Sequence, residues 1–172
     1  MTEEISPPKS YHHGNLRAEL LDTAIEQLRE QGTEELSLRA LARAIGVSQT
    51  APYRHFADKG DLLAAMATRG YRNLLACLQQ AGAGAGSNPR DQLVAFAHAY
   101  VDYAASNPKL FKLMFGPTVQ PSDKYPELRD ASRETILLVQ QMLARGMDQD
   151  IFRRQDIVYL ANAAWAGIHG LA

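Results

Sequence analysis

A short apolar stripe that ends at a glycine constrains the fold of this 172-residue chain more than any other feature. After Ser37, which can cap a helix, apolar residues fall at i, i+3, i+4 and i+7: Leu38, Leu41, Ala42 and Ile45. Two short helices cross closely only where the contact residue is small and the turn accepts a positive φ. Ala42 and Gly46 meet these two needs four residues apart, so the segment predicts a tight helical pair.

The second member of this pair has a free polar face. With Ile45 and Val47 packed inward beside Gly46, residues 48–55 present polar and aromatic groups on the opposite side: Gln49, Thr50, Tyr53 and His55. Side chains of these types reach base edges, phosphates and the thymine methyl group of DNA. The spacing alone suits any tight helical hairpin. The full string from Leu36 to Phe56, followed by Lys59, is more specific for a helix-turn-helix that reads DNA.

Net charge does not by itself indicate a nucleic-acid partner, because the formal value is −1. The distribution of charge is more informative. Residues 36–60 carry four cations against the single anion Asp58: Arg39, Arg43, Arg54 and Lys59. This basic face suits a compact DNA-reading module, although a solvated helix face has the same composition.

Helical periodicity continues through the rest of the chain, and no segment alternates as a strand does. About eight helices are expected, over residues 15–31, 37–45, 48–55, 58–80, 90–105, 107–115, 125–147 and 154–171. The glycines of residues 82–86 are expected to end the fourth helix, and Asn88-Pro89 to start the next. The fold class is therefore all-α, divided into a flexible tail (1–10), a helix-turn-helix domain (11–57), a connecting helix (58–80) and a C-terminal helical bundle (81–172).

Residues 11 to about 75 resemble the DNA-binding domain of the TetR (tetracycline-repressor) family. The resemblance rests on the strings Ala44-Ile-Gly-Val-Ser48, Tyr53-Arg-His-Phe56 and Asp58-Lys-Gly-Asp-Leu-Leu63. It implies an all-helical homodimer that binds double-stranded operator DNA and represses transcription. By position it assigns DNA contacts to Ser37, Arg39, Gln49, Thr50, Ala51, Tyr53, His55 and Lys59. Pro52 departs from the common family pattern, but a normal helix is still expected, since a first helical turn needs no N–H bond from proline.

The second half resembles the regulatory domain of a TetR subgroup with a C-terminal Trp, His and Gly motif, in Tyr100-Val-Asp-Tyr103, Asn107–Gly116 and Trp165–Gly170. This resemblance implies a small-molecule cavity and a dimer interface built from the last two helices. Because family members usually continue past the motif, a dimerisation helix is expected to be missing from this chain or to lie beyond Ala172. The candidate pocket residues, each with plain core packing as its alternative, are Phe96, Tyr100, Tyr103, Phe111, Met114, Phe115, Met142, Trp165 and His169.

Other residue types argue against other classes of site. The single Cys77 rules out a disulfide framework and a cysteine zinc site, and it suits a reducing cytoplasm. His98 and His169 lack a partner at metal-ligand spacing, so neither a metal site nor a cofactor is expected. No apolar run approaches the ~20 residues of a membrane span. No nucleophile–base pair or phosphate loop indicates an enzyme.

Two alternatives stay open beside a repressor that a ligand releases from DNA. A TetR-like fold can serve as a protein adaptor or a nucleoid-associated protein without effector control. The string Tyr11-His12-His13-Gly-Asn15 resembles an extension that some family members lay along DNA, and a tail without a DNA role fits it equally well. Whether such a protein represses or activates depends on the position of its operator, which the chain does not encode.

Overall fold

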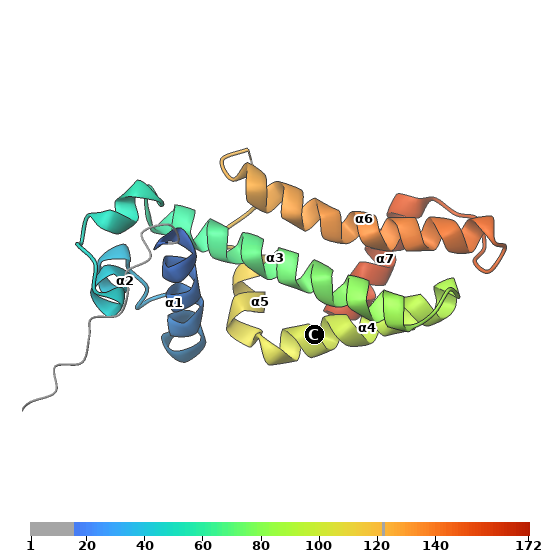
Figure 1. Ribbon diagram of the computed structural model, residues 1–172. Coiled ribbons are helices and arrows are strands. Elements are labelled where there is room, and N and C mark those ends of the chain that lie inside the picture. Colours follow the sequence, from blue (N-terminus) through green and yellow to red (C-terminus); the bar gives the residue numbers. More distant parts are fainter. Residues whose placement is uncertain (1–15, 122) are drawn as a thin grey trace, which may run out of the picture.

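The computed structural model describes residues 16–121 and 123–172 (Figure 1). Over these residues the chain forms seven α-helices and one 3-10 helix, without a strand, which confirms the predicted all-α class. The elements are α1 (Leu16–Gln31), α2 (Leu38–Ile45), η1 (Ala51–Arg54), α3 (Lys59–Gly84), α4 (Pro89–Ser106), α5 (Pro108–Phe115), α6 (Pro126–Asp148) and α7 (Ile157–His169). None of the described helices is long and apolar enough to cross a membrane. The Tyr11-His12-His13 string and the expected cap Asn15 lie outside the described residues.

Side-chain caps begin three helices where the sequence predicts them. The Ser37 hydroxyl accepts a hydrogen bond from the Ala40 N–H at 3.1 Å, and the Asp58 carboxylate accepts one from the Asp61 N–H at 2.8 Å. Asn88 caps α4 in the same way. Each cap satisfies a backbone donor that has no partner within its own helix. Local sequence therefore determines where these helices start.

The predicted third helix over residues 48–55 is wrong in kind and extent, because this segment contains only the short 3-10 helix η1. An α-helical turn here needs a hydrogen bond from the N–H of residue 52 to the Ser48 carbonyl, and Pro52 has no N–H. The Ser48 carbonyl instead accepts from the Ala51 N–H at 3.0 Å, which is the tighter 3-10 spacing. Ser48 does not cap the helix, and its hydroxyl lies 3.3 Å from that of Thr50.

The predicted end of the connecting helix at residue 80 is also wrong, since α3 continues to Gly84. Packing explains the difference. Gly82 is buried beneath the Phe96 ring of α4, and a Cβ at this position would lie 2.5 Å from Cε1 of that ring. This close contact between helices offsets the low helix propensity of glycine, about 1 kcal/mol relative to alanine. The helix therefore persists until the turn at Gly86, where φ is 78°.

The long helix α3 is the centre of the molecule (Figure 1). Its first turns pack against α1, which forms with α2 and η1 the unit that we call the head, and its remainder packs against α4, α5 and α6, which with α7 we call the bundle. α7 packs against α4 and α6. The largest fully buried side chains of α3 are Leu62, Met66, Leu74 and Leu78. One apolar core therefore runs from the head into the bundle.

Polar contacts between α1 and α5 also join the head to the bundle. Arg29 donates to the side-chain carbonyl of Asn107 at 3.2 Å, and the Lys109 ammonium donates to the Glu30 carbonyl at 2.8 Å. Because these groups are exposed, each contact adds little to stability. They lie where α1 packs against α5.

Candidate functional site

The head buries one side of α2 and exposes the other. Leu41 and Ala42 are fully buried. Gly46 has φ 76°, the left-handed conformation that the turn was predicted to need, and Ile45 and Val47 beside it are half-buried. The Val47 N–H donates to the Ala42 carbonyl at 2.9 Å and closes the end of α2. These contacts hold the turn between α2 and η1 in one conformation.

The exposed surface of the head carries the residues that the sequence assigns to DNA contact. Ala51 is half-buried, and the exposed residues are Ser37, Arg39, Gln49, Thr50, Tyr53, His55 and Lys59. Three of them also form local hydrogen bonds: Ser37 caps α2, the Thr50 hydroxyl lies 3.3 Å from that of Ser48, and the Lys59 ammonium donates to the Glu34 carbonyl at 3.3 Å. The head thus presents hydrogen-bonding groups, cations and a phenol ring to solvent, the kinds of group that contact phosphates and base edges.

Arg17, in the first turn of α1, is a further cation of the head that sequence reasoning missed. Its guanidinium lies 5.4 Å from the centroid of the buried Phe56 ring, within the range of cation–π attraction. With His55 it lines a hollow of about 200 Å³ between the head and the start of α6. The sequence feature that could have identified Arg17 is its position in the first turn of a helix, where the helix dipole disfavours a cation.

Aromatic rings from α4, α5 and α7 form one cluster in the bundle. Tyr100 packs edge-on against Phe111 and Trp165, with ring centroids 5.4 and 5.0 Å apart, and its hydroxyl lies 2.8 Å from Nδ1 of His169. The Phe115 centroid lies 5.8 Å from that of Trp165 and 4.8 Å from that of His169. The structure therefore brings together five of the nine predicted pocket residues.

Three buried tyrosines use their hydroxyls within the protein. Tyr71 donates to the Met114 carbonyl at 3.0 Å, and Tyr103 donates to the Gly70 carbonyl at 2.9 Å. Burial raises the pKa of Tyr71 and of Tyr103 to about 12, because a phenolate would lose its hydration. The same desolvation raises the pKa of Tyr100. These groups are neutral near pH 7 and act as hydrogen-bond donors and packing groups.

A cleft of about 800 Å³ opens among α3, α5, the segment after α5, α6 and α7. Its volume is in the range of small-molecule sites. Its larger apolar side chains are Tyr71, Met114, Phe115, Ile136, Leu137 and Trp165, and its polar ones include Gln120, Asp130, Arg133, Glu134 and Gln140. Met114, Phe115 and Trp165 were predicted for a pocket. The residues from α6 were missed, because only the packing of α6 on α3 determines which side of it faces the cleft.

Trp165 also lines a second, more enclosed cavity of about 20 Å³. Its other lining residues are Leu78, Leu93, Phe96, Tyr100, Val139, Ala164 and Ile168. Four predicted pocket residues line neither space: Tyr103, Phe111, Met142 and His169. Met142 is fully buried in the core, and Tyr103 borders a shallow hollow between α3 and α4 beside the exposed Cys77.

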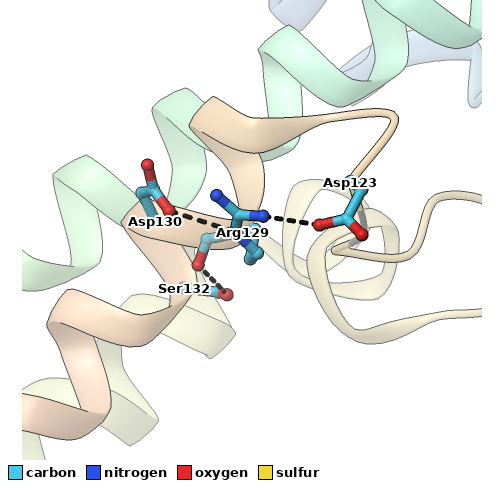
Figure 2. A network of polar contacts seen from close by, with 4 residues as sticks. All are labelled: Asp123, Arg129, Asp130 and Ser132. Carbon is cyan, nitrogen blue, oxygen red and sulfur yellow. Dashed lines mark hydrogen bonds and ion pairs between the residues drawn. The ribbon is translucent and has the colours of Figure 1, made fainter.

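Arg129, in the first turn of α6, forms ion pairs with two carboxylates, one before the helix and one within it (Figure 2). The Arg129 guanidinium donates to Asp123 at 2.6 Å and to Asp130 at 3.2 Å, and the Ser132 hydroxyl donates to the Arg129 carbonyl at 2.8 Å. Asp130 borders the cleft with its charge already paired. Arg133 is the only cation in the cleft lining, and no carboxylate of the described residues lies within ion-pair distance of it.

Over residues 16–121 and 123–172, no three His, Cys, Asp or Glu side chains lie together as metal ligands.

Two family descriptions match this chain. Residues 20–66 match bacterial regulatory proteins of the tetR family, and residues 93–172 match the tetracyclin repressor-like C-terminal domain. The first match covers most of α1, all of α2 and η1, and the start of α3, and the second covers most of α4 and all of α5, α6 and α7.

Individual relatives agree with these matches. A structure of a protein with unknown function from Rhodococcus sp. RHA1 is 35% identical, with a TM-score of 0.85 over 95% of this chain and 84% of that one. The HTH-type transcriptional regulator Rv1816 of Mycobacterium tuberculosis is 29% identical over 60% of this chain and 45% of its own length. The chain spans about half the length of the curated relatives it matches. The transcriptional regulator FadR from Bacillus subtilis, in complex with stearoyl-CoA, shares the fold at 14% identity, with a TM-score of 0.73 over 88% of this chain and 82% of that one.

Proposed function

Because the chain belongs to the tetR family of bacterial regulatory proteins, we propose that it is a cytoplasmic transcriptional regulator that binds double-stranded operator DNA through its head. The observation that carries this proposal is the exposed surface of the head. The Tyr53 side chain is 47% exposed, although Leu41 and Ala42 of the same head are fully buried. A large ring that packs no core is available to contact a partner.

The contacts with DNA follow from the position of each exposed group. We assign Gln49, Thr50 and Ala51 to base edges, Arg39 to a phosphate or a base edge, and Tyr53, His55 and Lys59 to phosphates. Ser37 contributes by holding the start of α2 through its cap. The short η1 turn makes the reading element compact, so that specificity rests on few side chains.

We propose that the active form is a homodimer in which α7 contributes to the interface. Only Ala161 of α7 is buried, although the helix is rich in apolar residues. Val158 and Tyr159 are 53% and 70% exposed, and the small residues Ala163, Ala166 and Gly167 are also exposed. An apolar face of this kind is typical of a surface that a second copy covers. Two heads would then contact successive major grooves about 34–36 Å apart.

We further propose that the protein is a repressor, of the subgroup with a C-terminal Trp, His and Gly motif, and that a small molecule in the cleft releases it from the operator. The cleft lies against α3, which also carries Lys59 and the start of the head, so a ligand that shifts α3 changes the spacing of the two heads. The FadR protein of the comparison holds stearoyl-CoA, so a fold of this kind accommodates a small molecule. A difference of ~1–3 kcal/mol in ligand affinity between two conformations changes operator affinity ~5–150-fold.

DNA binding by the purified protein to fragments of its own promoter region tests the proposal. Tyr53→Ala and Arg39→Ala are expected to weaken binding while far-UV circular dichroism stays unchanged, and Gln79→Ala, an exposed change on α3 far from the head, is expected to leave binding intact. Affinity is also expected to fall steeply with salt, with a slope in log–log form of about −0.9 per phosphate contact. Binding that ignores both head variants contradicts the assignment, and uniform coating of DNA without site preference points to the nucleoid-associated alternative.

A further inference from the structure

Trp165 separates two spaces of different character in the bundle. Its side chain is half-buried and lines both the open cleft of about 800 Å³ and the more enclosed cavity of about 20 Å³. The remaining residues that line the two spaces are different. Trp165 is therefore the one residue of the two linings that borders both spaces.

The inner cavity offers almost no hydrogen-bonding partner. Its walls are the aliphatic and aromatic carbons of α3, α4, α6 and α7, including Leu78, Leu93, Val139 and Ile168. The hydroxyl of Tyr100, its main polar group, bonds to His169. A cavity of this kind excludes water and accepts apolar groups. At about 20 Å³ it has room for no more than the end of an aliphatic chain unless the Trp165 indole moves, and it has no room for a ring.

The cleft outside Trp165 has the opposite character at its rim. Among the described residues, Arg133 is the one cation of the lining and has no carboxylate within ion-pair distance; of the two carboxylates in the lining, Asp130 is paired with Arg129 and Glu134 has no ion-pair partner. Gln120 and Gln140 add amide groups beside it. A ligand in the cleft therefore has a cation, amides and the Glu134 carboxylate around it, whereas the space on the other side of Trp165 offers apolar walls.

We propose that Trp165 is a movable partition and that the cleft takes an unbranched alkyl carboxylate, whose chain displaces the indole and enters the inner cavity while its carboxylate stays beside Arg133. This inference rests on the proposed function, since it names the ligand class of the proposed ligand cleft. The energetic reason is apolar burial: each methylene group that leaves water for an apolar space raises affinity by about fourfold.

The single tryptophan of the chain reports directly on this step. Titration with decanoate, kept below its micelle-forming concentration, is expected to give a saturable red shift of tryptophan emission, because the indole moves toward water. Butyrate, whose chain is too short to pass the indole, is expected to give none. Decanoate is expected to bind about 15-fold more tightly than octanoate, because two further methylenes are buried. A blue shift, an absent response or equal affinity for octanoate and decanoate overturns the partition.

Variants separate the two parts of the proposal. Ala164→Leu and Leu93→Phe each fill the inner cavity from a different helix and are expected to weaken decanoate binding about tenfold or more while helicity is retained. Arg133→Gln is expected to weaken decanoate about fivefold and to leave decanol, which carries no charge, unchanged. Equal loss for both probes refutes the role of Arg133, and unchanged binding in both cavity-filling variants refutes entry of the chain.

These results are independent of DNA binding. A protein that binds its promoter but shows no decanoate response retains the proposed function and loses this inference. A protein that binds decanoate but does not bind its promoter contradicts the proposed function and supports this inference, as a helical bundle that binds lipid.

Discussion

The turn at Gly46 allows the cost of a backbone conformation to be measured apart from side-chain packing. Gly46 has φ 76°, and a Cβ built on it meets no atom within 4 Å. Gly46→Ala therefore causes no clash and only forces an L-residue into the left-handed region, which costs roughly 1–2 kcal/mol. For a domain of this size a loss of 1 kcal/mol lowers Tm by about 2–4 °C, so the expected decrease is about 2–8 °C.

Thermal unfolding followed by circular dichroism measures this effect, and other substitutions provide controls. Gly46→Asn is expected to lower Tm less than Gly46→Ala does, because asparagine tolerates the left-handed region. Gly84→Ala, on α3 with open space around the new Cβ and no positive φ, is expected to leave Tm unchanged or to raise it slightly. If Gly46→Ala lowers Tm no more than Gly84→Ala does, the positive φ is not needed and the argument about the turn is wrong.

Three further predictions concern the bundle. Burial raises the pKa of Tyr71 to about 12, above its usual 10.0, so this tyrosine ionises at lower pH in the unfolded chain than in the folded protein. The free energy of unfolding is therefore expected to decrease as the pH rises from 10 toward 12. Urea unfolding at pH 9 and pH 11 measures this decrease, and Tyr71→Phe should make it smaller. Met142→Ala removes a fully buried side chain and is expected to lower the free energy of unfolding in urea by about 2–5 kcal/mol. A loss below about 1 kcal/mol would mean that the core collapses into the space left by the side chain. Ala166→Glu puts a charge on the exposed face of α7 and is expected to shift sedimentation from dimer to monomer. The same substitution at Ala83, which is exposed near the end of α3, is expected to leave the dimer intact. A monomeric wild-type protein would contradict the proposed interface.

Short-range features of the head could be read from the sequence. Ser37, Asp58 and Gly46 act within a few residues of their own positions, so their caps and turn depend little on the rest of the fold. The exposure of Gln49, Thr50 and Tyr53 followed from the same local pattern. The prediction of a normal helix at Pro52 is wrong, because the missing N–H of this residue removes the α-helical bond to Ser48 and leaves a 3-10 turn.

Features of the bundle depended on contacts between distant segments. The glycines near the end of α3 predicted a break, and the Phe96 ring from α4 stabilises the helix through Gly82. Arg133 has no periodic or motif signal, and it lines the cleft only because the opposite side of α6 packs on α3. The predicted pocket residues separate for the same reason: Met114 and Phe115 line the cleft, and Met142 fills the core.

By itself the sequence determined the helical class, most helix starts, the left-handed turn and the exposed surface of the head, because hydrogen bonds and dihedral preferences over a few residues decide each of them. Only the tertiary structure decided how far α3 extends, which side of α6 lines the cleft and that one indole borders two cavities. Those outcomes depend on the burial of side chains from distant segments against each other, and burial is a property of the whole packed chain.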